Sequence, residues 1–256
     1  MESRSQSLKI CLDSLERQTF KDFEIILVTE RGNLVELRNE GAKRSKGKFL
    51  VFIDDDVICE PRWMESIVSS FYQGDDIGGV SGPAIITLTY RRNRDLFRFT
   101  RIKKLYDWMF LDGKSHLPGH FTSAGAWTTG ATSESCSYQG DVEFLEACNM
   151  VFRRDVFFEV GGFDEQFKGV GDWSEPDLSF RIRQRGYRLW FCRDAKLFHQ
   201  PSRTRSFSTG SQNRQRYANY ELLSNRWFKP CFKHSLYKLF LKGYYKHESI
   251  IRRFGR

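Results

Sequence analysis

The sequence predicts an α/β fold in which a mostly parallel sheet is covered by helices on both faces. Helical and strand-like patterns alternate over the first 71 residues, and this alternation is typical of parallel strands joined by crossover helices. The chain also has 256 residues, of which 40% are hydrophobic and 15% aromatic, enough for one domain with a substantial core. We therefore expect a folded protein of one main domain followed by a tail.

The N-terminal third has the clearest pattern. Residues 4–18 place apolar side chains at helical spacing, and FEIILV (23–28) follows as a short, continuously apolar strand. Residues 33–46 predict a second helix, and KFLVFI (48–53) predicts a second buried strand. A third helix is expected next, because Pro61 suits a first helical turn and apolar residues recur on one face after it.

The middle of the chain is less regular. GGVSGPAII (78–86) predicts a further strand, and residues 87–140 form a variable excursion whose second half is rich in Gly, Ser and Thr. The remaining pattern comprises, in order, a strand over 141–154, a short helix that ends at Gly161 and Gly162, a helix over 174–185, and the two strands RLWFC and KLFH.

Positive charge is concentrated near the C-terminus. Residues 201–256 hold 13 basic and 2 acidic residues, so the net charge of +9 belongs to this tail. Residues 202–216 predict a flexible loop, and a helix is expected after Pro230. Its predicted apolar face comprises Phe232, Leu236, Leu239 and Phe240, with Lys238, Lys242 and Lys246 opposite. This design suits an anionic membrane surface, and packing of the apolar face on the body is the equally weighted alternative.

Several classes of protein are disfavoured by what the chain lacks. Its six cysteines have no paired spacing typical of zinc sites or disulfide frameworks. No apolar run reaches the ~18 residues needed to span a bilayer, and the N-terminus lacks the apolar core of a signal peptide. No recognised nucleic-acid-binding motif accompanies the basic tail. We expect a cytoplasmic protein with reduced thiols and no nucleic-acid partner.

Three consecutive aspartates, Asp54, Asp55 and Asp56, follow directly on the predicted 48–53 strand. Ligands of open α/β sheets bind beyond the carboxyl ends of the strands. Carboxylates crowded there are stabilised by a divalent cation, and Mg²⁺ is commonly held by one or two carboxylates together with substrate phosphates. The cluster therefore indicates a site for a metal and a phosphorylated ligand, with a solvated acidic loop as the equally weighted alternative.

Five stretches of the chain resemble the family 2 glycosyltransferases, which have a GT-A fold. They are SLERQTFKDFEIILV (14–28), LRNEGAKRSKGKFLVFIDDDV (37–57), VFRRDVFFEVGGFDEQF (151–167), SEPDLSFRIRQRGYRL (174–189) and KLFHQPS (196–202). The resemblance implies a glycosyltransferase domain at 1–202, followed by the loop and basic tail at 203–256. Within the domain it implies a nucleotide-binding half at 1–86, the variable excursion at 87–140 and an acceptor half at 141–202.

The resemblance assigns donor contacts to the first half. Asp54 and Asp55 would contact the nucleotide and ribose, and Asp56 would ligate the Mn²⁺ or Mg²⁺ ion that bridges the diphosphate of the donor. Glu30 falls where the family has an Asp that contacts the base, and an exposed turn acid is the alternative. Arg38 would face the diphosphate or hold the aspartate loop, and a helix-surface cation is the alternative.

The resemblance also implies a catalytic base. Inverting sugar transfer needs a carboxylate that takes the proton of the acceptor hydroxyl. Glu175 aligns with the base of the family, which is more often an Asp, and Asp172 is the fallback. His199 becomes a candidate third metal ligand or diphosphate contact, with a structural histidine as the equally weighted alternative. An imidazole ligand shifts the preference from Mg²⁺ toward Mn²⁺.

Three further residues are assigned to acceptor binding. Asn149 and Trp173 would line the acceptor pocket, because sugar rings lie well on aromatic faces, although a Trp is more often part of a core. Asp177 is the third, and its alternative is a structural role, in which it caps the helix or pairs with Arg181 four residues later.

Two departures from the family refine this hypothesis. The family opens with a strand that carries part of the nucleotide pocket, whereas this chain begins at the helix that follows it, so a neighbouring strand is expected to lack a partner. QNRQRY (212–217) also departs from the Gln-x-x-Arg-Trp pattern of processive synthases, which favours transfer of a single sugar.

The resulting hypothesis is a metal-dependent inverting glycosyltransferase at the inner face of the membrane. It would move one sugar from a nucleoside-diphosphate sugar to a hydroxyl acceptor, such as a lipid-linked or cell-surface glycan precursor. The alternatives are a non-catalytic nucleotide-sugar-binding relative and, with least support, a basic nucleic-acid-binding protein.

Overall fold

The computed structural model of the protein describes residues 4–86, 100–128, 130–133, 136–200 and 210–254. The described strands are β1 (Phe49–Phe52), β2 (Val57–Cys59), β3 (Ile77–Ser81), β4 (Ala84–Ile86), β5 (Gly140–Val142), β6 (Met150–Arg153), β7 (Arg188–Phe191) and β8 (Leu197–His199). The described helices are α1 (Arg4–Glu16), α2 (Leu34–Arg44), α3 (Trp63–Phe71), α5 (Thr100–Phe110), α6 (Arg154–Glu159), α7 (Ser174–Gln184), α8 (Gly210–Trp227) and α9 (Phe232–Phe254), with a short 3-10 turn at Gly130–Thr132.

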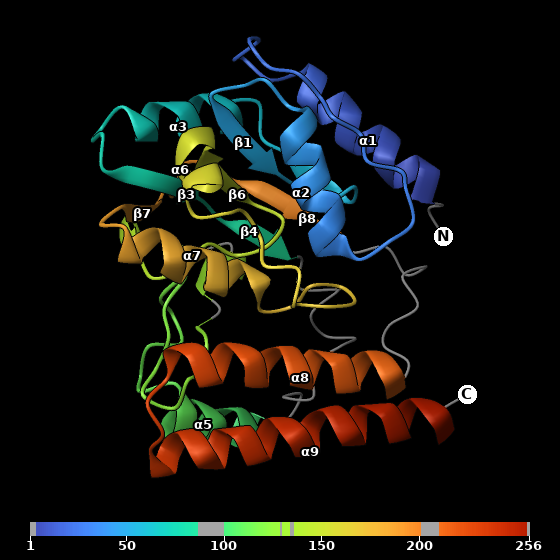
Figure 1. Cartoon of the computed structure of the whole chain (residues 1–256), viewed down its shortest axis with the longest axis vertical. Helices are drawn as coiled ribbons and strands as arrows, with labels where there is room; N and C mark the ends of the chain where they lie inside the picture. Colours follow the sequence, from blue (N-terminus) through green and yellow to red (C-terminus); the bar gives the residue numbers. More distant parts are fainter. Residues whose placement is uncertain (1–3, 87–99, 129, 134–135, 201–209, 255–256) are drawn as a thin grey trace.

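The strands form two mixed sheets, with α1 and α3 above them and α7 below them in the view of Figure 1. The larger sheet has the order β1-β6-β3-β7-β5, and among its described strands only β3 and β7 are parallel. The smaller sheet has the order β2-β8-β4, in which β4 and β8 are parallel. The α/β class is confirmed, but the expectation of a mostly parallel sheet is wrong. A run of apolar residues is compatible with a buried strand of either direction, so this pattern alone does not predict whether neighbouring strands are parallel.

The segment FEIILV forms no strand, contrary to the prediction. Ile25 and Leu27 are 47% and 49% exposed, and the Glu24 carboxylate accepts hydrogen bonds from the backbone N–H groups of Lys46 and Gly47. An extended segment becomes a strand only where a neighbour satisfies its backbone. Among the described strands β1 pairs with β6 alone, so residues 23–28 do not add a strand to the other edge of β1.

The predicted helices at 4–18, 33–46 and 174–185 are confirmed as α1, α2 and α7. Asn33 caps α2, where its side chain accepts a hydrogen bond from the backbone N–H of Val35. The strand predicted at 78–86 is split into β3 and β4, which belong to different sheets. A Cβ at Gly82, between them, would collide with the carbonyl oxygen of Ala195, so this close approach of two backbones requires glycine.

The excursion and the 141–154 segment also differ from the prediction. Helix α5 lies within the 87–140 excursion, for which the sequence predicted no regular element. The single strand expected over 141–154 is divided into β5 and β6 by an irregular segment that includes Cys148, whose φ is 68°. The short helix before Gly161 and Gly162 is confirmed as α6, and both glycines have positive φ angles, as expected of a helix C-terminus.

The C-terminal helices are part of the main hydrophobic core. Tyr220 and Leu223 of α8 and Tyr237 and Leu241 of α9 are buried in the same cluster as β6 and α7. Figure 1 shows α8 lying between α7 and α9. The predicted loop at 202–216 is wrong from Gly210 onward, where α8 begins, and its earlier part lies outside the described residues. The division of the chain at residue 202 stays a prediction.

The packed face of α9 differs from the predicted one. Its buried side chains are those of His234, Tyr237 and Leu241, whereas Phe232 and Leu239 are exposed. The alternative of packing on the body is confirmed for Leu236 and Phe240, which are partly buried against the main core, and contact of the tail with a membrane stays a prediction. No helix in the described part of the chain has both the length and the apolar character required to cross a membrane.

Candidate functional site

The aspartate cluster lies where two strands of the smaller sheet meet. Asp54 and Asp56 occupy the short connection from β1 to β2, and β2 pairs with β8 in a register that places Val57 opposite His199. The backbone N–H of Gln200 donates a hydrogen bond to the carbonyl oxygen of Asp56 at 2.8 Å, which fixes the end of β8 against this connection. Strand pairing therefore brings His199 to the aspartates across 143 residues of sequence.

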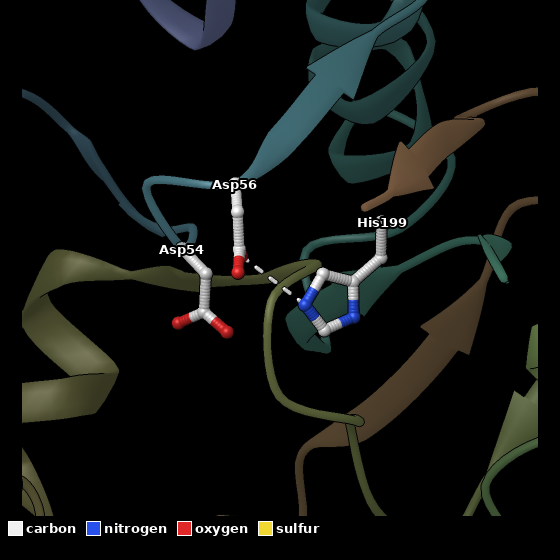
Figure 2. Close-up of side chains that lie close together, drawn as sticks. All are labelled: Asp54, Asp56 and His199. Carbon is white, nitrogen blue, oxygen red and sulfur yellow. Dashed lines mark ion pairs between the residues drawn. The ribbon is translucent and has the colours of Figure 1, made fainter. Parts of the chain in front are cut away.

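The three side chains converge at one point, as Figure 2 shows. Asp56 Oδ1 lies 3.2 Å from His199 Nε2, and ligand atoms of Asp54, Asp56 and His199 all lie within 4.8 Å of one another. Asp56 is only 4% exposed, and a buried carboxylate is stable in its charged form only beside positive charge. Two carboxylates and an imidazole form a donor set that suits Mn²⁺. The residues present therefore fit a divalent metal.

Cys148 adjoins this group and was not singled out by the sequence analysis. Its sulfur lies 3.9 Å from Nδ1 of His199. Burial raises the pKa of the Cys148 thiol well above its usual value, and the negative charge of Asp54 adds to this effect. With Nδ1 next to Cys148, Nε2 is the ring nitrogen that faces the aspartates. An isolated cysteine in a strand-like pattern gives no signal for this placement.

The predicted base is linked to the same region by Arg38. Arg38 of α2 and Glu175 in the first turn of α7 form an ion pair at 2.6 Å, with side-chain exposures of 10% and 8%. Burial raises the pKa of Glu175, and the Arg38 guanidinium offsets this only in part. Burial lowers the pKa of Arg38, but the charges of Glu175 and Asp54 outweigh this effect and raise it. Arg38 therefore interacts electrostatically with both Glu175 and the aspartate cluster and is not a helix-surface cation.

The structure gives less support to the predicted roles of Glu30, Asp55 and Asp172. Glu30 is exposed and pairs with Arg44 at 2.7 Å, and the hydrogen bond from Arg44 lowers the pKa of its carboxyl. This geometry supports the alternative of an exposed turn acid. The contact of Asp55 with a nucleotide stays a prediction. Asp172, the fallback base, forms an ion pair with Arg216 of α8 at 2.5 Å, so each of the two candidate bases has an arginine partner.

Two of the predicted acceptor-binding residues lie in the interior. Asn149 is buried, where its side chain accepts a hydrogen bond from the Trp63 indole and donates two to the carbonyl oxygens of Pro83 and Ala195. Trp173 is buried with its ring stacked on Trp127 at a centroid distance of 4.2 Å. The structure therefore favours structural roles for both residues over contact with an acceptor.

Asp177 is also buried and anchors α8 to α7. Its carboxylate pairs with Arg181 at 2.9 Å, which confirms the alternative of a pair four residues apart. It also accepts hydrogen bonds from Arg226 at 3.1 Å and from the Trp227 indole at 2.9 Å. Because its carboxylate interacts with three donors, Asp177 has a structural role. It holds α7, the helix that carries Glu175, against the C-terminal helices.

Comparison with known proteins identifies related sequences. The family profile described as "Glycosyl transferase family 2" matches residues 28–161, just over half of the chain. The chain is 24% identical over 235 residues to the glucosyl-dolichyl phosphate glucuronosyltransferase of Haloferax volcanii, covering 77% of this chain and 65% of that protein. It is also 24% identical over 232 residues to the O-antigen biosynthesis protein RfbC of Myxococcus xanthus, covering 79% and 17% respectively. The chain thus spans less than two thirds of the length of these relatives.

Solved structures show the same fold. GalNAc-T7 with UDP, GalNAc and Mn²⁺ is similar with a TM-score of 0.53 at 17% identity, over 78% of this chain and 35% of that one. The mannosyltransferase PcManGT from Pyrobaculum calidifontis, in complex with GDP-Man and Mn²⁺, is similar with a TM-score of 0.50 at 14% identity, over 93% and 66%. These similarities confirm the GT-A-like α/β fold. With the profile match to more than half of its residues, including Arg38 and all three aspartates, the chain belongs to glycosyltransferase family 2.

Proposed function

We propose that the protein is a metal-dependent inverting glycosyltransferase that moves a single sugar from a nucleoside-diphosphate sugar to a hydroxyl acceptor. The observation that carries this proposal is the arrangement around Arg38. Its guanidinium pairs with Glu175 and is affected by the charge of Asp54, which itself converges with Asp56 and His199. A candidate base and a candidate metal site are thus connected through one buried side chain.

Asp54, Asp56 and His199 would hold Mn²⁺ or Mg²⁺, and the imidazole favours Mn²⁺. A metal bound there supplies positive charge that stabilises the diphosphate as it leaves with the electrons of its bond to the anomeric carbon. The two similar structures named above contain Mn²⁺ with UDP or GDP-Man, which supports this choice. Asp55 would contact the nucleotide or ribose beside the metal.

Glu175 would take the proton of the acceptor hydroxyl. As the acceptor oxygen forms its bond to the anomeric carbon, the bond from that carbon to the donor phosphate breaks, and attack from the opposite face inverts the configuration. Burial raises the pKa of Glu175 and makes the carboxylate a stronger base, while the Arg38 guanidinium favours its ionised form. Arg38 therefore positions the base and adjusts its proton affinity.

The acceptor belongs, in this proposal, to lipid-linked or cell-surface glycan precursors, and the protein acts at the inner face of a membrane that its C-terminal tail contacts. The names of the two relatives, a glucosyl-dolichyl phosphate glucuronosyltransferase and an O-antigen biosynthesis protein, support this class of acceptor. A non-catalytic nucleotide-sugar-binding protein is the second candidate. The irregular, half-exposed FEIILV segment favours it, since that segment lies in the nucleotide-binding half.

Two variants separate these candidates. Donor binding and release of nucleoside diphosphate are measured with Mn²⁺ for a panel of nucleotide sugars and glycan acceptors. Asp56→Asn is expected to lose metal-dependent donor binding, whereas Glu175→Gln is expected to keep it and to lose at least about 100-fold in transfer. Glu65→Gln, at an acid of the same half whose side chain is 43% exposed, is the matched control and should retain activity.

The outcomes are distinct. A wild-type protein that binds a donor with Mn²⁺ but transfers no sugar to any acceptor supports the non-catalytic candidate. Equal Mn²⁺-dependent binding by wild type and Asp56→Asn contradicts the metal site on which both candidates depend.

A further inference from the structure

Exposed apolar side chains gather on two neighbouring helices at the end of the molecule remote from α1 in Figure 1. On α5, Trp108 is 76% exposed and Leu105 is 54% exposed. On α9, Phe232 is 83% exposed and Leu239 is 66% exposed. Scattered exposed apolar residues are normal, but a large indole and a phenyl ring left in water on adjacent helices indicate a binding surface.

The two helices are joined by their inner faces. Tyr106 and Phe110 of α5 contact Tyr237 and Phe240 of α9, with ring centroids 5.2 to 6.5 Å apart. Along α5, Leu105 and Trp108 point away from the side that carries Tyr106 and Phe110, as their exposure confirms. The exposed residues thus lie on helices that already pack against each other through aromatic rings, of which Phe110 and Tyr237 are buried.

The charge of the same region is positive. Between Phe232 and Lys246, α9 carries four lysines and no acidic residue. Lys242 and Lys246 are exposed on α9, and Lys104 is exposed beside Leu105 on α5. Helices that present Trp, Phe and Leu together with lysines bind at the interface of anionic bilayers, where rings enter the acyl boundary and ammonium groups remain among the headgroups.

We propose that the outer faces of α5 and α9, comprising Leu105, Trp108, Phe232 and Leu239 with Lys104, Lys242 and Lys246, form a docking surface for an anionic lipid membrane. This proposal builds on the proposed function, since it identifies the surface that would bring the enzyme to a lipid-linked acceptor. It extends the contact beyond the C-terminal tail to α5 of the middle excursion. A second copy of the chain is the weaker candidate for this surface, because a symmetric contact would bring lysines against lysines.

Vesicle sedimentation tests the docking surface without donor, metal or acceptor. The full chain is expected to bind vesicles of phosphatidylcholine with phosphatidylglycerol and to bind pure phosphatidylcholine weakly. The combined variant Trp108→Ser, Phe232→Ser and Leu239→Ser is expected to weaken binding, by about tenfold for each side chain that enters the bilayer. Tyr72→Ser is the matched control, since Tyr72 is 73% exposed at the end of α3, and it should bind as wild type does.

The contribution of the lysines and the alternative of self-association are tested with the same preparations. Lys242→Glu with Lys246→Glu should abolish the preference for anionic vesicles, and added salt should have the same effect on the wild type. Equal binding of wild type and the combined apolar variant overturns the proposal. So does a wild-type dimer in solution that this variant converts to a monomer. Because the assay needs no sugar transfer, a failure here leaves the proposed enzymatic function intact, and a failure of transfer leaves the membrane result intact.

Discussion

Removal of the Arg38 guanidinium should destabilise the protein strongly, because it leaves Glu175 buried without its partner. The two side chains form an ion pair at 2.6 Å and are only 10% and 8% exposed. Breaking a buried pair by removing one partner costs about 3–5 kcal/mol in the free energy of unfolding, whereas replacing both partners is close to neutral. Arg38→Met is therefore expected to lower the free energy of unfolding by about 3 kcal/mol near neutral pH. The double variant Arg38→Met with Glu175→Gln should recover most of this stability.

The loss should depend on pH in a defined direction. Burial already raises the pKa of Glu175 above its usual value, and removal of Arg38 raises it further. The folded state then binds a proton that the unfolded state has released, so stability falls as pH increases through this window. Arg38→Met should thus be closer to wild type at about pH 5 than at about pH 8, because protonated Glu175 carries no unpaired charge.

Urea unfolding followed by circular dichroism at both pH values measures these differences. Arg44→Met is the matched control on the same helix, since Arg44 is 40% exposed and pairs with the exposed Glu30 and Glu40. It should lose less than about 1 kcal/mol. An Arg38→Met protein within about 1 kcal/mol of wild type at about pH 8 would refute the reasoning. A double variant as unstable as Arg38→Met would refute it equally.

Three further predictions follow from the packing. Gly82→Ala should lower the melting temperature by several degrees, because the new Cβ would collide with the Ala195 carbonyl oxygen. Gly243→Ala is the control and should not lower it, since no atom lies within 4 Å of a Cβ at Gly243. Equal melting temperatures of the two variants would contradict the close contact between Gly82 and Ala195. Burial should keep the Cys148 thiol unreactive toward a water-soluble disulfide reagent while exposed Cys231 reacts rapidly, and rapid modification of Cys148 in the native protein would contradict its placement. Asp177→Ala should lower the free energy of unfolding, measured with urea, by about 3 kcal/mol, because Arg181 and Arg226 both lose a buried partner. A decrease of less than about 1 kcal/mol would contradict the role of Asp177 in anchoring α8.

The sequence predicted local features of the fold and the most compact part of the site. The helix over 33–46 and the helix entered at Ser174 follow from apolar periodicity and end signals, both of which act within a few residues. The resemblance to the family made His199 a candidate ligand, and the pairing of β2 with β8 brings it to Asp54 and Asp56.

Features that depend on distant partners could not be predicted in the same way. FEIILV has an apolar pattern, but a strand requires a hydrogen-bonded neighbour that the pattern does not record. The interior positions of Asn149 and Trp173 depend on Trp63 and Trp127, which lie far away in the sequence. The pair between Arg38 and Glu175 spans 137 residues, and no spacing rule connects them.

The central claim is that Asp54, Asp56 and His199 form a metal site for the phosphates of a donor. Isothermal titration of Mn²⁺ into the protein, with and without UDP or GDP, tests it most directly. We predict that wild type binds Mn²⁺ more tightly when a nucleoside diphosphate is present, and that Asp56→Asn and His199→Ala each weaken this binding by at least about tenfold. Mn²⁺ binding that is unchanged in both variants would contradict the claim.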